Sequence, residues 1–427
     1  MPEPRPLSAP LSHAQQRLLL AELLAPGKPE NVIVIAIQFI GPFDVEILRM
    51  ALADVTARHD ILRTVYGWEE GSPIQHVLNP EDCPDQLTVV PATNPSTDVN
   101  RAAERQAAQL RREPFDLSAQ PPFRARLQEL DSNNHVLVLS VHHIACDGRS
   151  VQILTRELGT AYASRARGLV PQWQPVPSYR DYVRWELEHL NKWAAKDLPF
   201  WRNLLAAGPI PSFLPTNPAP AEASGMQLVL LPAAVVDRFT KAGRALRALP
   251  LSLLMSGVTA ALRSQFGAAP ACLGTIFSGR TRREFSSVVG CFVNPIAIPV
   301  YCSPQLSNED LIKVVNRTVS SCLSHGRTPY DQVIHALGRA THRDLFQVLT
   351  VLHHPARDIS KFTPGISARR VPVFSPTSSE LLVEAGPQPD GAWGLTVSWR
   401  AQAINVSTGC QLAEELTRFL YELRTTE

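Results

Sequence analysis

The residues best suited to chemistry lie in one short segment, Val141-His142-His143-Ile144-Ala145-Cys146-Asp147-Gly148. A histidine ring accepts a proton near neutral pH, and an amine or hydroxyl must lose a proton when it attacks a carbonyl. We expect Asp147 to brace the turn, because a carboxylate beside a buried strand needs an arginine or backbone donors. Gly148 permits a backbone conformation or a close approach that a side chain would obstruct. The segment therefore predicts base chemistry at a histidine.

A predicted strand and a predicted helix position this segment. The run 135–141 is almost continuously apolar, which is typical of a strand buried on both faces, and a helix is predicted from Arg149. Neighbouring side chains of a strand point to opposite faces, so His142 and His143 cannot both address one substrate. The turn that begins at Ile144 can leave His143 exposed at the end of the strand. We therefore expect His142 to be structural and His143 to be catalytic.

Histidine and aspartate are also metal ligands, and a second histidine pair occurs later in the chain. Opposed strand faces make joint ligation by His142 and His143 awkward, and no further His or Cys lies nearby in the sequence. We therefore predict no metal site. The second pair, in the segment His353 to Ile359, repeats HHxxxD but lacks the glycine. It is interpreted as a strand end with a solvated pair, or alternatively as a supporting part of the cleft.

Length and composition indicate an ordinary globular protein with two lobes. The chain has 427 residues, of which 44% are hydrophobic and 19% charged. Lys and Arg number 41 against 39 Asp and Glu, which leaves a formal charge of +2 and predicts no nucleic-acid surface. Residues 1–10 do not resemble a signal peptide, and the apolar runs are far shorter than the ~20 residues of a membrane span. The seven scattered cysteines favour reduced thiols in a cytoplasm and no zinc site.

Proline-rich segments and helix signals outline the organisation of the chain. The first helix is predicted to begin at Ser12 in a capping box with Gln15, with Leu19, Leu20, Leu23 and Leu24 on its apolar side. The run 168–177 contains three prolines and no periodicity, so the lobe boundary is placed there. This predicts an N-terminal lobe at 1–170 and a C-terminal lobe at 171–427. Strands and helices alternate in both, which favours the α/β class.

An ordered series of motifs resembles the condensation domains of nonribosomal peptide synthetases, within the chloramphenicol acetyltransferase-like superfamily. The series covers nearly the whole chain, and HHxxxDG lies at the expected distance from its opening motif. The matching segments, in chain order, are Ser12 to Arg17, Arg58 to Thr64, His142 to Gly148, Tyr179 to Tyr182, Phe200-Trp201, Gly279-Arg280, Val289 to Asn294, His325 to Pro329 and Leu345 to Val348.

The resemblance implies a fold and an activity. Two acetyltransferase-like lobes would form a V with an active-site tunnel between them, and carrier proteins would approach its two mouths. Each partner would feed a phosphopantetheine arm toward His143, so no cofactor would be bound permanently. An acyl or peptidyl group would pass from a carrier thioester to an amine or alcohol, giving an amide or an ester. In such domains the histidine corresponding to His143 acts as a general base or positions the nucleophile.

The resemblance also implies roles for several supporting residues. Asp147 would be braced by an arginine, for which Arg58 is the first choice, and the rivals are Arg17, Arg63 and Arg280. Each arginine could instead form an ordinary ion pair. Asn294 would tie the segment that crosses between the lobes, or it is a turn asparagine. Arg149 stands where many members carry an aromatic residue, so the mouth of the site is expected to favour a polar or acidic acceptor.

Three alternatives to condensation share the fold or the motif. An epimerisation domain shares HHxxxDG, but the stretch Val289 to Asn294 favours condensation. A plant-type acyl-CoA transferase shares HxxxDG, but its DFGWG segment has only a faint echo at Gly391 to Gly394. A recruitment module would keep the fold only to bind carrier proteins or tailoring enzymes. No adenylation or carrier segment is found in these 427 residues, so a monomer that acts on partners in trans is expected, either free-standing or excised from a megasynthase.

Overall fold

The computed structural model describes two compact units, each built around one six-stranded sheet. Unit 1 comprises residues 1–189, 280–292 and 357–375, and unit 2 comprises the remaining segments, which are 190–279, 293–356 and 376–427. Two downstream segments therefore belong to unit 1, while the sequence-based lobe boundary stays a prediction. The structure describes residues 8–92, 98–206, 214, 224–267, 272–301, 303, 305–339, 345–353, 361–363, 365–388 and 391–423.

Unit 1 contains the sheet that ends at the histidine pair. Its strand order is β12-β13-β2-β7-β6-β5, and all neighbours are antiparallel except β5 and β6. The strands are β2 (Val32–Ile40), β5 (Leu87–Val90), β6 (Phe123–Asp131), β7 (Asn134–His142), β12 (Lys361–Thr363) and β13 (Ile366–Val371). A smaller antiparallel sheet has the order β1-β4-β3 and consists of β1 (Ser8–Pro10), β3 (Thr64–Glu69) and β4 (Ser72–Val77).

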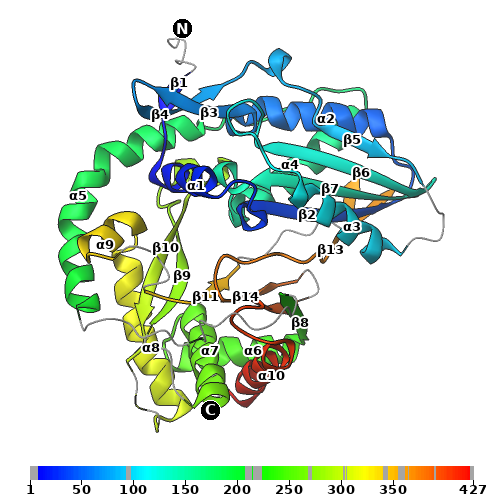
Figure 1. Ribbon diagram of the computed structural model, residues 1–427. Coiled ribbons are helices and arrows are strands. Elements are labelled where there is room, and N and C mark those ends of the chain that lie inside the picture. Colours follow the sequence, from blue (N-terminus) through cyan, green and yellow to red (C-terminus); the bar gives the residue numbers. More distant parts are fainter. Residues whose placement is uncertain are drawn as a thin grey trace. The chain divides into compact units, whose positions relative to one another are not determined.

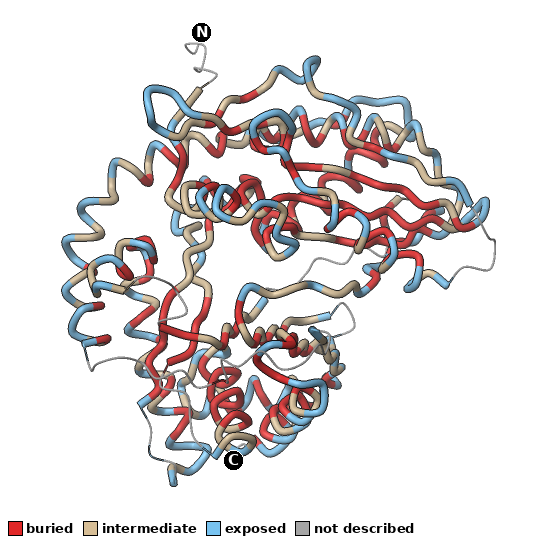
Figure 2. Tube along the Cα trace, viewed as in Figure 1, coloured by how far each residue is buried: buried red, intermediate tan, exposed pale blue. Residues whose placement is uncertain are grey.

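Helices cover both faces of the large sheet, which explains why β7 is apolar along almost its whole length (Figures 1 and 2). Leu137, Leu139 and Val141 pack on the side of α2 and α4, whereas Val136 and Val138 pack against the alanine-rich face of α3. The predicted buried strand at 135–141 is thereby confirmed. The helices of this unit are α1 (His13–Leu24), α2 (Val45–Arg58), α3 (Val99–Arg112) and α4 (Gly148–Arg165), with short turns η1 (Pro29–Asn31), η2 (Asp60–Arg63), η3 (Pro80–Asp82), η4 (His143–Ala145) and η5 (Arg283–Ser287).

The N-terminal helix α1 begins as predicted but buries a different face. Ser12 caps it, and the capping box with Gln15 is present. The predicted apolar side is wrong, because Leu19 is buried while the other leucines, Leu20, Leu23 and Leu24, are exposed. The buried side of α1 carries Gln15 and Glu22, whose polar atoms are hydrogen-bonded inside the unit. A hydrophobic count could not identify a helix face that is buried through hydrogen bonds.

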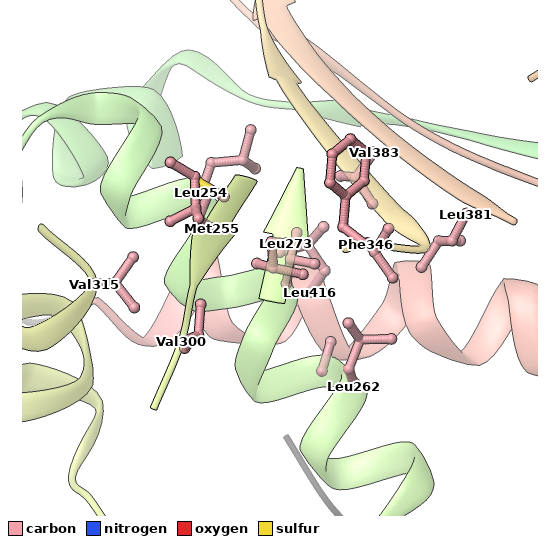
Figure 3. Packing of buried hydrophobic residues seen from close by; sticks show 14 of the residues in the cluster. Leu254, Met255, Leu262, Leu273, Val300, Val315, Phe346, Leu381, Val383 and Leu416 are labelled. Carbon is pink, nitrogen blue, oxygen red and sulfur yellow. The ribbon is translucent and has the colours of Figure 1, made fainter. Parts of the chain in front are cut away.

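Unit 2 is a second α/β layer with its own core. Its strand order is β10-β9-β11-β14-β15-β8, with parallel pairing between β9 and β11 and between β11 and β14. Figure 3 shows Leu254, Met255 and Leu262 of α7 packing with Phe346 and Leu416 in this core. Its strands are β8 (Gly225–Leu231), β9 (Cys272–Ser278), β10 (Val293–Pro299), β11 (Val348–Leu352), β14 (Leu381–Pro387) and β15 (Trp393–Trp399), and its helices are α6 (Ala233–Ala245), α7 (Pro250–Phe266), α8 (Asn308–Ser324), α9 (Tyr330–Ala336) and α10 (Val406–Glu422).

The long helix α5 (Tyr179–Leu205) contributes residues to both units, because the division falls between His189 and Leu190. It follows residues 169–178, which form neither helix nor strand. Among the described residues, no single helix is long and apolar enough to cross a membrane. The pair α6 and α7, bent by 107°, passes that test by length and composition alone.

Candidate active site

The histidine segment forms the predicted turn between a strand and a helix. β7 ends at His142, the short turn η4 begins at His143, and α4 starts at Gly148. The carboxylate of Asp147 caps α4, since its Oδ1 accepts the backbone N–H of Ser150 at 2.7 Å. The strand alternation therefore stops between the two histidines, which gives their rings different environments.

His142 is held inside the unit by two hydrogen bonds. Its Nδ1 accepts the backbone N–H of Ile144 at 3.1 Å, and its Nε2 lies 3.4 Å from Oε2 of Glu22. Burial would raise the pKa of Glu22, but hydrogen bonds from His142, Gly27 and Asn31 lower that pKa to about 2. Because Nδ1 accepts a hydrogen bond, Nε2 carries the ring proton and donates a hydrogen bond to the carboxylate of Glu22, which fixes the tautomer of that ring. His142 is thus the structural member of the pair.

His143 is half-buried, and only one of its ring nitrogens has a hydrogen-bond partner in the described part of the chain. Nδ1 lies 3.2 Å from the carbonyl oxygen of Cys146. Since a carbonyl oxygen only accepts, Nδ1 carries the ring proton and donates a hydrogen bond to that oxygen. Nε2 therefore keeps its lone pair. Burial lowers the pKa of His143 to about 4, and the nearby His142 and Arg17 also disfavour its protonation. The ring is a neutral base at pH 7.

Asp147 is buried and receives donors from three directions. Besides capping α4, it accepts Nη2 of Arg280 at 3.0 Å on Oδ1 and 3.2 Å on Oδ2, and the backbone N–H of Phe292 at 3.2 Å. Arg280 in turn donates from Nη1 to the carbonyl oxygens of Phe285 and Val288 and stacks 3.8 Å from the Phe292 ring centroid. Asp147 thus fastens the histidine turn to segment 280–292 and is a brace.

The arginine expected first to pair with Asp147 binds elsewhere. Arg58 donates from Nε to Oε2 of Glu157 at 2.9 Å and lies 4.8 Å over the ring of Trp173. The preference for Arg58 is therefore wrong, and Arg280, one of its rivals, takes the place. Arg58 is the last residue of α2, where the carboxylate of Glu157 on α4 pairs with it.

The other predicted site residues are more dispersed. Arg63 donates to the carbonyl oxygen of Leu78, and Arg17 is half-buried on α1 with its charge acting on His143. Gly148 is the exposed first residue of α4, and Arg149 is exposed and donates to Gln152 at 2.9 Å. Within the described residues, the side chains of Arg63, Arg17 and Arg149 form no hydrogen bond or ion pair with Asp147, and neither does Gly148.

Asn294 belongs to unit 2, where it ties a loop. Its Nδ2 donates to the carbonyl oxygens of Gly326 and Thr328, at 3.0 and 2.7 Å, and its Oδ1 accepts the backbone N–H of Tyr330 at 2.9 Å. These contacts hold the connection between α8 and α9. In the second histidine pair, Nε2 of His353 lies 2.8 Å from Oε1 of Glu384, and His354 lies outside the described residues.

Ser150 is a supporting residue that sequence reasoning missed. Its buried hydroxyl donates to the carbonyl oxygen of Gly290 at 2.8 Å and accepts both the Gly290 N–H at 3.0 Å and Nη2 of Arg280 at 2.7 Å. The close approach needs glycine, because a Cβ at position 290 would lie 2.0 Å from the Tyr179 ring. The sequence offered one signal for this role, namely a small polar residue three positions after the aspartate that caps α4.

Ser150→Ala is expected to lower the free energy of unfolding by about 1–3 kcal/mol, because it leaves the buried Gly290 N–H without its acceptor. Chemical denaturation measures this loss. Thr160→Ala is the matched control on the same helix, since Thr160 is exposed and bonds only within α4. Equal stability of the two variants would show that the hydroxyl network contributes little.

Activity that depends on neutral His143 is expected to persist at low pH. The pKa of about 4 lies below the ordinary value near 6.5, so the base form remains at pH 5 and is lost only as pH falls through about 4. The free energy of unfolding already decreases as pH falls below about 6.5, because the unfolded chain takes up this proton there while the folded chain does not. A rate profile with an alcohol acceptor, which does not titrate here, checks the assignment. An acid limb near pH 6.5 would contradict it.

A family model decides where this fold and site belong. Residues 7–422, nearly the whole chain, match the model of the condensation domain. The chain belongs to the condensation domain family. The predicted resemblance and the α/β acetyltransferase-like fold are thereby confirmed for this condensation domain. Domains of this family are generally acyltransferases that work with the phosphopantetheine arms of carrier proteins.

Curated relatives of this condensation domain are nonribosomal peptide synthetases. It is 30% identical to a dimodular nonribosomal peptide synthase of Bacillus subtilis over 97% of the chain, and 32% identical to an isonitrile lipopeptide synthase of Mycobacterium tuberculosis over 94%. The chain spans only 18% and 17% of these two relatives. The similarity therefore concerns one domain of a longer synthetase.

Solved structures share the fold of this condensation domain over nearly its full length. The X-domain from teicoplanin biosynthesis has a TM-score of 0.82 at 25% identity, covering 98% of this chain and 95% of that one. The first condensation domain of the calcium-dependent antibiotic synthetase has a TM-score of 0.82 at 20% identity, covering 98% and 97%. The second likeness shows the fold alone.

Proposed function

We propose that this condensation domain transfers an acyl or peptidyl group from a carrier-protein thioester to an amine or alcohol, forming an amide or an ester. The observation that carries the proposal is the state of His143, a neutral ring whose Nδ1–H is engaged and whose Nε2 lone pair remains available. A base with this tautomer can receive the proton that a nucleophile must lose on attack.

In this reaction, the proton that the acceptor loses passes to His143 and then to the leaving thiolate. The acceptor attacks the thioester carbonyl and gives its proton to Nε2 of His143, so that a tetrahedral intermediate and an imidazolium form. Collapse of the intermediate breaks the C–S bond, and the imidazolium returns the proton to the leaving thiolate. A low pKa makes the imidazolium a strong acid, which favours this return. His143 could also position the acceptor by hydrogen bonding before attack.

The proposed partners are an acyl- or peptidyl-loaded carrier protein and an acceptor that is free or carrier-bound. The phosphopantetheine arm belongs to the carrier and supplies the thioester. Arg149, exposed directly after the start of α4, is proposed to favour acidic acceptors. Arg149→Ala would then raise KM for an acidic acceptor more than for its neutral amide, and unchanged kinetics with every acceptor would dispose of this role.

A recruitment module is the second candidate, favoured by the likeness to the X-domain from teicoplanin biosynthesis. Another similar structure is a complex of the X-domain and OxyB from teicoplanin biosynthesis. An intact base with its lone pair available, braced by a buried Asp147 and Arg280, supports catalysis instead. A recruitment domain has no need for this arrangement.

Product analysis tests the proposal. The protein is incubated with acyl-loaded carrier protein and a panel of amines and alcohols, and products are identified by mass. Wild type and the Thr160→Ala control are expected to form an amide or an ester at similar rates, and His143→Ala is expected to form it far more slowly. Inverted configuration of a carrier-bound aminoacyl group would indicate epimerisation. Absence of any product, with retained carrier binding, would favour recruitment.

A further inference from the structure

The solvent-facing side of α3 carries a row of arginines. Arg101, Arg105 and Arg112 are exposed and lie within ~40° of one another around the helix axis, because each residue advances by ~100°. The row extends over ~16 Å along the helix. Within the described residues, none of the three side chains forms a hydrogen bond, an ion pair or a ring contact. We call these three residues the α3 arginine row.

The carboxylates closest to the row in sequence are engaged elsewhere. Glu104 accepts Nη1 of Arg111 at 3.1 Å on Oε1 and the backbone N–H of Phe374 at 2.8 Å on Oε2. Glu113, directly after the end of α3, accepts Nη2 of Arg126 at 2.9 Å. Both acids therefore pair with arginines that are buried, and the row keeps its positive charge toward solvent.

The row does not stabilise the helix that carries it. Arg101 lies in the first turn, where the helix dipole favours acidic residues and disfavours a cation. Arg101 and Arg105 are four residues apart, so their like charges repel each other. Asp98 is occupied as the N-cap, where its Oδ1 accepts the backbone N–H groups of Asn100 and Arg101. Local helix stability therefore does not explain the row, whereas an acidic partner does.

The pattern of charges fits a protein helix better than a polyanion. A row one residue wide matches acidic side chains that repeat at the same spacing along a second helix. Nucleic acids and anionic membranes present phosphates over a wide surface, and they would meet the carboxylates of Glu104 and Glu113, whose side chains are 43% and 38% exposed. Unit 1 also has as many acidic as basic residues, so it has no general attraction for polyanions.

We propose that the α3 arginine row is a docking surface for an acidic helix of a partner protein. Guanidinium groups pair with carboxylates through two parallel hydrogen bonds, and exposed complementary charges determine which partner associates and how fast it does so. The inference goes beyond the proposed acyl transfer, because it does not depend on chemistry at His143.

Fluorescence anisotropy with a defined probe tests the docking surface. The probe is a stapled helical peptide with glutamates at the spacing of the row, and its twin carries glutamines at the same positions. At low salt, wild type should bind the glutamate peptide about tenfold more tightly than the twin, and high salt should remove the preference. The triple variant Arg101→Gln, Arg105→Gln and Arg112→Gln should bind both peptides equally. Equal binding of both peptides by wild type would overturn the proposal.

A triple variant on α6 is the matched control. Arg238→Gln, Lys241→Gln and Arg244→Gln together remove the same charge from exposed positions of unit 2, which are spread over ~120° of the helix. This variant should keep the preference for the glutamate peptide. Equal losses in both triple variants would reveal a general charge effect and refute the docking surface. Duplex DNA and phosphatidylserine vesicles are compared as probes, and tighter row-dependent binding of either would contradict a protein partner.

The thermal unfolding midpoint provides a second test. Arg101→Gln should raise the midpoint at low salt, since it removes the first-turn cation and its repulsion from Arg105. A lower midpoint would show that Arg101 is paired within the folded chain and would contradict its availability for docking.

Discussion

Replacing His143 with alanine is expected to lower kcat/KM by about 10²- to 10⁴-fold, the range typical of a lost general base. The variant keeps the Asp147 and Arg280 contacts, because neither involves the His143 ring. Its thermal unfolding should therefore resemble that of wild type. The rate is measured as product formed from acyl-loaded carrier protein. A folded variant with full rate would mean that the nucleophile loses its proton without this ring.

His142 provides the matched comparison for that experiment. Its side chain bonds Ile144 and Glu22 inside the unit. Alanine at this position leaves a buried carboxylate and a buried N–H with fewer partners, so His142→Ala should destabilise the fold. Loss of rate in His142→Ala should accompany loss of folded protein, whereas in His143→Ala it should not. This separates a structural histidine from a catalytic one.

Replacing Arg280 with alanine is expected to lower the free energy of unfolding of unit 1 by about 3–5 kcal/mol, because it leaves Asp147 charged and buried. Asp147 is 2% exposed, so water cannot replace the lost donors. The histidine turn would lose its link to segment 280–292, and activity should fall as well. Denaturant unfolding followed by hydrogen exchange of unit 1 measures the loss.

Arg282→Ala is the control for Arg280→Ala, since Arg282 is exposed and its partner Glu284 is exposed too. Arg282→Ala should change the free energy of unfolding by no more than about 0.5 kcal/mol. A double-mutant cycle of Arg280→Ala with Asp147→Ala isolates the pair, and the second substitution should restore part of the stability. Arg280→Ala and Arg282→Ala with equal stabilities would contradict the assignment of Arg280 as the brace.

Local signals predicted the histidine turn because its causes are local. The apolar run of β7 and the capping aspartate are neighbours in sequence, and strand alternation separates His142 from His143 without reference to the rest of the chain. The capping box of α1 is local for the same reason. These features were confirmed in the structure.

The partner of Asp147 could not be deduced in this way. Arg280 lies 133 residues from Asp147 in sequence and joins unit 1 through a downstream segment. The resemblance implied an arginine without deciding which one, and Arg58 was preferred although Glu157 takes its charge. Ser150 was missed because a serine early in a helix also occurs without any long-range partner. The partner of Asp147 and the contacts of Ser150 are both set by tertiary packing between segments far apart in the chain, which local sequence patterns do not reveal.

The most direct test of the account is ¹⁵N NMR of the imidazole of His143, assigned by comparison with His143→Ala. The structure predicts a neutral ring at pH 7 with the proton on Nδ1, which titrates at about pH 4. A proton on Nε2 at pH 7, or titration near pH 6.5 or above, would contradict it. The first outcome would remove the Nε2 lone pair on which the proposed acyl transfer depends, and the second would show that burial does not hold the pKa of this ring low.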